Sequence, residues 1–163
     1  MAHSKPPAKI SILESHSPAD TEQLARRLAA TLCGGETIAL IGGIGAGKTT
    51  WVQGLAAGLA CTIVPSSPTF VLQQWYRGRL LVCHLDCYRL DDPEEIMRLG
   101  LLEPLDTHQV TVIEWADRAG AWLPPERLSL TFQAGRDDNE RIILAECYGR
   151  GHDHLMAALE QTP

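Results

Sequence analysis

Residues 42–49 read GGIGAGKT, a run of glycines and small apolar residues that ends in a lysine and a threonine. The run fits the pattern G-x-x-x-x-G-K-[ST], in which a nearly bare backbone turns its N–H groups toward phosphate oxygens. Lys48 would bring a full positive charge to the outer phosphates, and the hydroxyl of Thr49 is suited to hold Mg²⁺. The pattern therefore predicts a nucleotide-binding loop made of Gly42, Gly43, Ile44, Gly45, Ala46, Gly47, Lys48, Thr49 and Thr50.

The rest of the sequence narrows the choice of base. Proteins of this class that bind guanine normally carry an N/T-K-x-D element. The chain has only three lysines, Lys5, Lys9 and Lys48, and no such element surrounds them. ATP with Mg²⁺ is therefore the expected ligand.

Two predicted strands end in an acidic residue. The segment 80–88 contains Asp86, and the segment 109–115 contains Glu114. Ligands of open α/β sheets gather at the carboxyl ends of strands, so both acids are candidate catalytic residues together with Lys48. One would bind the metal directly or through water, and the other would orient a water or couple to a partner. Each could instead be a solvated strand end or a helix cap.

Three further residues could contribute. Thr69 follows a proline in the loop 64–70, where proteins with this phosphate loop often place a switch segment that contacts Mg²⁺ and the outer phosphate. Arg89 could contact phosphate or an acidic partner, or pair with a neighbouring aspartate. Trp115 directly follows Glu114 and could be a core residue or part of a partner interface.

The elements that would position these residues follow from hydrophobic periodicity and breaker residues. Helices are predicted at 17–35, 48–60, 92–105 and 152–160, and strands at 36–41, 70–76, 80–88, 109–115, 123–132 and 140–148. This order predicts a three-layer α/β domain of the P-loop NTPase type, with a mainly parallel central sheet and added antiparallel strands. Residues 1–16 are expected to be a loose lead-in, and residues 17–163 a single domain.

Composition limits the function. The net charge is −6, so the chain lacks the basic excess needed to bind tRNA strongly by itself. No apolar run is long enough for a membrane span, and the N-terminus has no signal-peptide pattern, which predicts a cytoplasmic protein. Cys83 and Cys87 would lie about 13 Å apart on one strand, too far to share a zinc ion.

Several short segments together resemble one family. GGIGAGKTT, SPTF, HLDCYRL, DPEE, LGL and VIEWADR, followed by LP, occur in this order. Over about residues 17–150 the chain resembles the bacterial TsaE (YjeE) family of tRNA threonylcarbamoyladenosine biosynthesis ATPases. The resemblance implies a P-loop ATPase that is weak alone and is stimulated by its partners TsaB and TsaD. It also implies a role in making N6-threonylcarbamoyladenosine at position 37 of tRNA, with hydrolysis resetting the TsaB–TsaD complex between cycles.

The resemblance also assigns roles by position. It implies that Thr49 and Glu114 bind Mg²⁺, that Asp86 is the aspartate of the H-x-D-x-Y-R element, and that Thr69 is the switch threonine. Trp115 matches the tryptophan that follows the family's glutamate.

The resemblance also concerns the adenine contacts and the tip of the phosphate loop. Adenine contacts would fall around residues 17–21. Position 43 is commonly acidic in the family and is glycine here, which could alter how the loop tip meets a partner.

Two other functions stay open. A small-molecule kinase would usually carry clustered arginines in a lid over the phosphates, whereas the eleven arginines here are scattered. A nucleotide-dependent interaction module would bind ATP without hydrolysing it.

Overall fold

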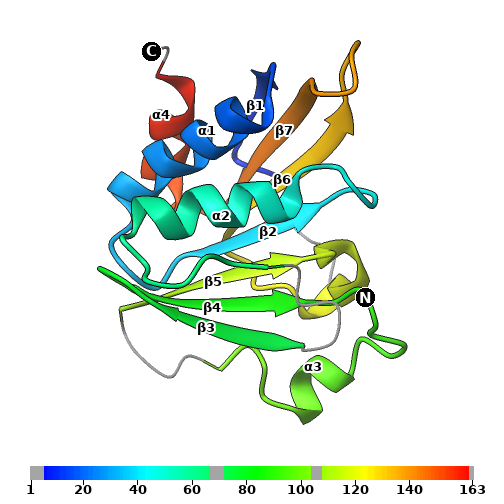
Figure 1. Ribbon diagram of the computed structural model, residues 1–163. Helices are drawn as coiled ribbons and strands as arrows, with labels where there is room; N and C mark the ends of the chain where they lie inside the picture. Colours follow the sequence, from blue (N-terminus) through cyan, green and yellow to red (C-terminus); the bar gives the residue numbers. More distant parts are fainter. Residues whose placement is uncertain (1–5, 67–71, 104–107, 162–163) are drawn as a thin grey trace.

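The computed structural model describes residues 6–66, 72–103 and 108–161. The described chain forms a sheet of seven strands in the order β1-β7-β6-β2-β5-β4-β3, with helices on both faces (Figure 1). The strands are β1 (Lys9–Ser15), β2 (Thr37–Ile41), β3 (Gln73–Arg77), β4 (Leu81–Asp86), β5 (Gln109–Glu114), β6 (Arg127–Ala134) and β7 (Arg141–Tyr148). The helices are α1 (Pro18–Thr31), α2 (Lys48–Gly58), α3 (Glu95–Arg98), α4 (Asp153–Glu160) and the 3-10 segment η1 (Ala116–Trp122).

The centre of the sheet is parallel and its edges are antiparallel. β2 pairs in parallel with both β5 and β6, and β4 pairs in parallel with β5. β1, β7 and β3 are added antiparallel. The carboxyl ends of β2, β4 and β5 therefore meet at one edge, where a parallel sheet presents its ligand-binding groups.

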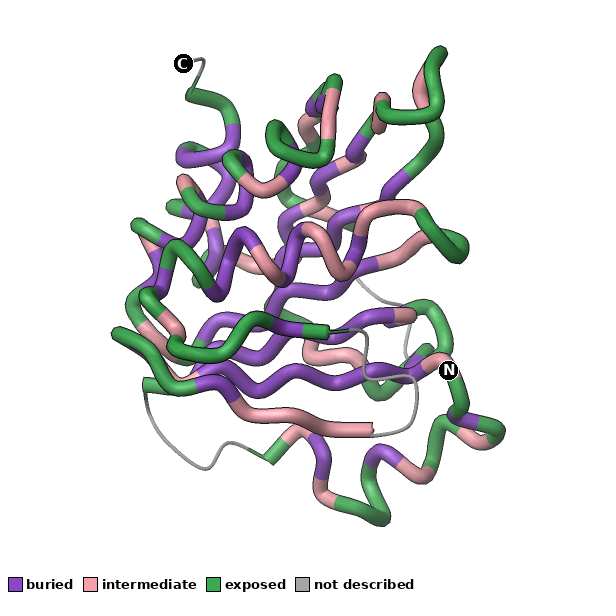
Figure 2. The backbone as a smooth tube through the Cα atoms, in the orientation of Figure 1, coloured by how far each residue is buried: buried purple, intermediate pink, exposed green. Residues whose placement is uncertain are grey.

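The helices form the outer layers. In Figure 1, α1 and α2 lie side by side across one face of the sheet, and α4 packs against α1 and β1. Their apolar side chains form the larger core cluster, which includes Leu28, Trp51 and Leu55. On the other face, α3 and η1 close a smaller cluster around Leu85 and Ile113. Figure 2 shows that the central strands between these layers are buried. This arrangement confirms the predicted three-layer α/β class with a mixed sheet.

Local signals explain the elements that carry the site. α1 begins after Ser17, whose hydroxyl accepts from the backbone N–H of Asp20 at 3.1 Å, and Pro18 occupies its first turn. β5 is buried along its whole length, as expected of a central parallel strand. No helix among the described residues is long and apolar enough to cross a membrane.

The prediction of a loose lead-in over residues 1–16 is wrong for residues 9–15, which form β1. β1 pairs antiparallel with β7 along its whole length and turns Leu13 toward the core. Ile10 and Ile12 point outward and are 59% and 68% exposed. Two isoleucines of β1 thus face solvent, where polar side chains are usual. The strand is held in place by pairing with β7, which lies far along the chain.

Candidate nucleotide-binding site

The loop between β2 and α2 has a backbone that only glycine adopts readily. Gly42, Gly45 and Gly47 have φ values of +153°, +71° and +104°. A Cβ at Gly42 would lie 3.0 Å from the carbonyl oxygen of Phe132, so this position also lacks room for a side chain. Gly43 has no heavy atom within 4 Å of its added Cβ and no positive φ. A side chain, acidic or not, would therefore fit at position 43 without displacing a neighbouring atom.

Lys48 is the first residue of α2 and lies inside the loop. Its Nζ donates to the carbonyl oxygens of Gly42 and Gly43 at 2.7 and 2.8 Å. It also lies 4.0 Å from the centroid of the Trp115 ring. Burial lowers the pKa of Lys48, and the nearby carboxylates of Glu114 and Asp86 oppose that shift. A cation is thus held within the phosphate loop by carbonyls, an aromatic face and two acids.

Glu114 is joined to the start of α2. The hydroxyl of Thr49 lies 3.2 and 3.3 Å from the two carboxylate oxygens of Glu114 and donates to this group. Glu114 is the last residue of β5 and is only 2% exposed. Carboxylate and hydroxyl oxygens are the ligands that Mg²⁺ prefers, so the donor set fits that ion.

A series of hydrogen-bonded side chains, largely buried, leads away from Glu114. His84 Nε2 lies 3.0 Å from Glu114 Oε1, and His84 Nδ1 lies 3.2 Å from the hydroxyl of Tyr76. That hydroxyl also donates to the side chain of Gln74. Burial, reinforced by the charge of Glu114, raises the pKa of Tyr76 to about 12. The phenol therefore stays protonated at neutral pH.

Asp86 lies directly beside Glu114. The two residues are register partners at the ends of β4 and β5. Asp86 Oδ1 accepts from the backbone N–H of Tyr88 at 2.8 Å. Burial raises the pKa of Asp86, and the neighbouring Glu114 carboxylate raises it further. The sheet thus brings both predicted acids to one point and gives them different surroundings.

An aromatic layer closes one side of the site. Trp115 has left-handed backbone angles, φ 55° and ψ 42°, where β5 turns into η1. Its ring lies 4.9 Å from that of Tyr88, and the guanidinium of Arg118 lies within 5.7 Å of both ring centroids. Arg118 was not predicted from the sequence, because nothing in the local pattern places it beside Tyr88 and Trp115.

Arg141, at the start of β7, supports the phosphate loop from the other side. Its Nε donates to Ala46 O at 2.9 Å and its Nη2 to Gly45 O at 3.0 Å. Arg141 was not predicted from the sequence, since it lies 95 residues from Ala46 and belongs to no local motif. By holding two carbonyls outward, this guanidinium fixes the peptide planes whose N–H groups line the loop.

Many of these groups line a cavity of about 410 Å³. Loop residues 44–50 line it, together with Asp86, Tyr88, Glu114 and Trp115. Pro18, Thr21, Asn139 and Arg141 also line the cavity, so the start of α1, expected near the adenine, is among the lining residues. A cavity of this size is typical of small-molecule sites.

Some predicted residues are not brought to the site. Thr69 lies outside the described residues. Arg89 is exposed and is not among the described residues that line the cavity. Cys83 and Cys87 are buried thiols whose pKa values are raised by burial, to about 12 for Cys87, which suits packing and not metal binding.

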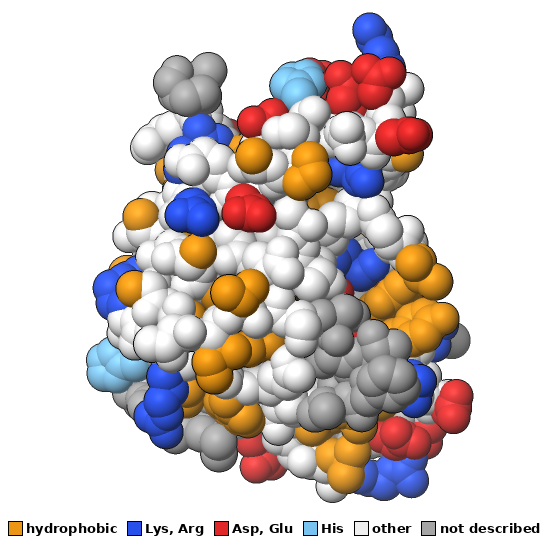
Figure 3. All heavy atoms as spheres, viewed as in Figure 1, with side chains coloured by type: hydrophobic (Ala, Val, Ile, Leu, Met, Phe, Trp, Pro, Cys, Tyr) orange, Lys and Arg blue, Asp and Glu red, His pale blue; other side chains and the backbone are white. Residues whose placement is uncertain are grey.

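The surface charge agrees with the composition. In Figure 3, Lys and Arg side chains are dispersed over the visible face, and acidic side chains form one group near the turn between β6 and β7 and another at the lower right. Within the part of the chain that the structure describes, this face shows no continuous basic stripe of the kind that binds nucleic acid.

The chain is similar to known proteins over most of its length. The family model "Threonylcarbamoyl adenosine biosynthesis protein TsaE" matches residues 15–143. The tRNA threonylcarbamoyladenosine biosynthesis protein TsaE of Bacillus subtilis is 36% identical over 146 residues, covering 89% of this chain and 90% of that protein. The protein of the same name from Treponema pallidum is 36% identical over 131 residues, covering 80% of this chain and 97% of that protein.

A solved structure supports the same relationship. The crystal structure of Bacillus subtilis YdiB superposes with a TM-score of 0.73 and 30% sequence identity, covering 93% of this chain and 94% of that one. The match therefore extends to the fold as well as to the motifs. With a glycine-rich loop, two strand-end acids and a family model that spans most of the sequence, the chain belongs to the TsaE family of threonylcarbamoyl adenosine biosynthesis proteins.

Proposed function

We propose that the chain is the Mg²⁺-dependent ATP-binding and ATP-hydrolysing component of cytoplasmic tRNA N6-threonylcarbamoyladenosine biosynthesis, acting with TsaB and TsaD. The observation that carries this proposal is the contact between Thr49 and Glu114, 3.2 Å long, beside a loop of nearly bare backbone. The contact joins the end of β5 to the start of α2, where a triphosphate and its metal would meet.

The described residues divide the chemistry between them. The amides of the loop and Lys48 would bind the phosphates, and Thr49 and Glu114 would hold Mg²⁺. When bound, Mg²⁺ would neutralise charge that develops on the phosphate oxygens. Asp86, at the end of the neighbouring strand β4, would orient the attacking water. The raised pKa of Asp86 suits a group that accepts a proton.

Action through protein partners agrees with the charge of the chain. The net charge of −6 disfavours tight contact with tRNA phosphates, whose binding depends on Lys and Arg. TsaB and TsaD would therefore carry the contact with tRNA, and ATP hydrolysis would reset their complex between cycles. Tight, salt-sensitive binding of tRNA by the isolated chain would contradict this division of labour.

The test is ATP hydrolysis by the purified chain, measured with and without purified TsaB–TsaD. We expect slow phosphate release by the chain alone and a clear stimulation by the partners. Transfer of phosphate to a metabolite in the absence of other proteins would indicate a small-molecule kinase instead. ATP that stays intact even with TsaB–TsaD present would indicate a non-hydrolysing interaction module.

A further inference from the structure

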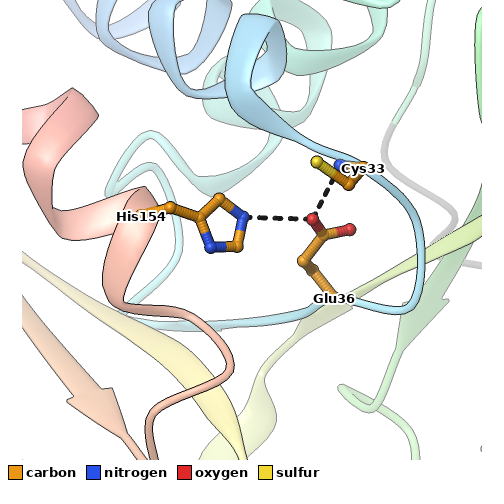
Figure 4. Close-up of side chains that lie close together, drawn as sticks. All are labelled: Cys33, Glu36 and His154. Carbon is orange, nitrogen blue, oxygen red and sulfur yellow. Dashed lines mark hydrogen bonds and ion pairs between the residues drawn. The ribbon is translucent and has the colours of Figure 1, made fainter.

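A second cluster of metal-ligating groups lies away from the nucleotide cavity. It consists of Cys33 and Glu36, from the turn between α1 and β2, and of His154, from the first turn of α4 (Figure 4). The thiol, one carboxylate oxygen and one imidazole nitrogen all lie within 4.8 Å of one another. Among the described residues that line the nucleotide cavity, none of these three appears. The cluster is therefore separate from the proposed nucleotide-binding site.

The distances suit a small tetrahedral ion. Zinc binds thiolate sulfur at about 2.3 Å and imidazole nitrogen or carboxylate oxygen at about 2.0–2.2 Å, which places neighbouring ligand atoms about 3.5 Å apart. His154 Nε2 is already 3.2 Å from Glu36 Oε1. Cys33 is exposed, so its side chain is free to rotate inward by the remaining ångström or so at little cost. It would give up only a long hydrogen bond of 3.5 Å to the carbonyl of Thr31.

Glu36 is preorganised as a ligand. It is 4% exposed, and its two oxygens accept from the backbone N–H groups of Cys33 and Gly34, each at 2.7 Å. Hydrogen bonds of this kind orient the carboxylates of metal sites.

The mixture of donors selects the metal. A thiolate disfavours Mg²⁺ and Ca²⁺, whereas one sulfur, one nitrogen and one oxygen together suit Zn²⁺. His154 has 40% of its side chain exposed, so the ion can enter from solvent and water can complete its coordination. We propose that Cys33, Glu36 and His154 form a zinc-binding site that clips the turn after α1 to the start of α4. This proposal is independent of the nucleotide site.

The test is metal binding by the full chain, freed of metal and kept free of nucleotide. Co²⁺, used as a spectroscopic probe for zinc, should bind one equivalent and give the charge-transfer absorption of a cobalt–thiolate bond, and Zn²⁺ should displace it. At about 100 times its Kd, Zn²⁺ should raise the thermal unfolding midpoint by roughly 5–10 °C.

Variants of single residues show whether zinc binds at this site or at other thiols and histidines. Cys33→Ser should abolish the thiolate band, and His154→Ala should weaken zinc binding at least about 100-fold, since each removes a direct ligand. Two controls should bind zinc as the wild type does: Cys61→Ser removes a thiol elsewhere, and His16→Ala removes the exposed histidine that lies 3.4 Å from Glu140. ATP binding should be unchanged in all four variants, which shows that they are folded.

Two results would overturn the proposal. One is the absence of a thiolate band and of a stoichiometric zinc ion in the wild type. The other is a zinc affinity that Cys33→Ser and His154→Ala leave unchanged. Either result would mean that Glu36 serves only to fix the turn through the N–H groups of Cys33 and Gly34.

Discussion

His84 and Glu114 form a buried pair, with Nε2 of the histidine 3.0 Å from Oε1 of the glutamate and side chains 0% and 3% exposed. The hydroxyl of Thr49 donates to the same carboxylate, at 3.2 Å from Oε1 and 3.3 Å from Oε2. The imidazole therefore fixes the orientation of a carboxylate that we assign to Mg²⁺, as hydrogen-bonded partners of metal ligands generally do.

Glu114→Gln keeps the size of the side chain and removes its charge. We expect hydrolysis with Mg²⁺ to fall about 100-fold or more, because a metal ligand is lost. ATP affinity without Mg²⁺ should change little. Phosphate release and nucleotide titration, done on the same preparations, check both parts. Equal hydrolysis by wild type and variant would remove Glu114 from its assigned role.

His84→Ala would leave Glu114 buried without its imidazole partner. The free energy of unfolding should fall by about 1–3 kcal/mol, measured by denaturant titration. Mg²⁺-dependent hydrolysis should fall as well. His84→Gln, which can place an N–H group near the same oxygen, should restore part of the hydrolysis. If the alanine variant hydrolyses ATP as fast as the wild type, then Glu114 does not depend on His84 for its orientation.

Lys48→Ala removes the only lysine among the described residues that line the cavity. The ammonium is expected to neutralise the outer phosphates, so ATP binding should be lost at concentrations that saturate the wild type. Calorimetric titration measures this directly. Undiminished affinity in a folded variant would place the phosphates elsewhere.

Arg141→Ala should loosen the phosphate loop, since the guanidinium holds the carbonyls of Gly45 and Ala46. We expect KM for ATP to rise about tenfold, with a smaller change in kcat, because loss of two charge-assisted hydrogen bonds costs about 1.4 kcal/mol or more. Arg136→Ala, an exposed arginine in the same hairpin, is the matched control and should match the wild type. A fall in kcat at unchanged KM would point to a catalytic contact instead.

Asp86→Asn tests the cost of burying this acid. A carboxyl group whose pKa is raised by folding lowers the free energy of unfolding at any pH where it is ionised in the folded protein. At pH 7, without Mg²⁺ and nucleotide, the variant should therefore be more stable than the wild type. Its hydrolysis should nevertheless be slower. The stability difference should shrink as the pH falls toward the ordinary value of 3.8, because Asp86 then protonates in both states. Thermal unfolding across that range measures it, and a constant difference would argue against the raised pKa.

Local patterns were sufficient to predict much of this structure. The phosphate loop lies between a short apolar strand and a helix, and Asp86 and Glu114 lie at strand ends. The local residue pattern is sufficient to predict each of these positions. Parallel pairing then brings the two acids together, as the general behaviour of α/β sheets predicts.

The features that sequence reasoning missed depend on contacts between distant segments. Arg141 reaches the loop only because β7 joins the sheet beyond β6, and β1 is held in place by pairing with β7. The contact of His84 with Glu114 depends on the register of β4 against β5. A single sequence does not reveal which strands become neighbours, so these partners could be found only in the folded chain.

We propose that the phosphate loop and Glu114 bind ATP together with Mg²⁺. The most direct test is the affinity of the purified wild type and of Glu114→Gln for ATP, measured with Mg²⁺ and with a chelator in its place. We predict that Mg²⁺ tightens ATP binding by the wild type and has little effect on the variant. An equal effect of Mg²⁺ on both proteins, or no ATP binding by the wild type, would contradict the claim.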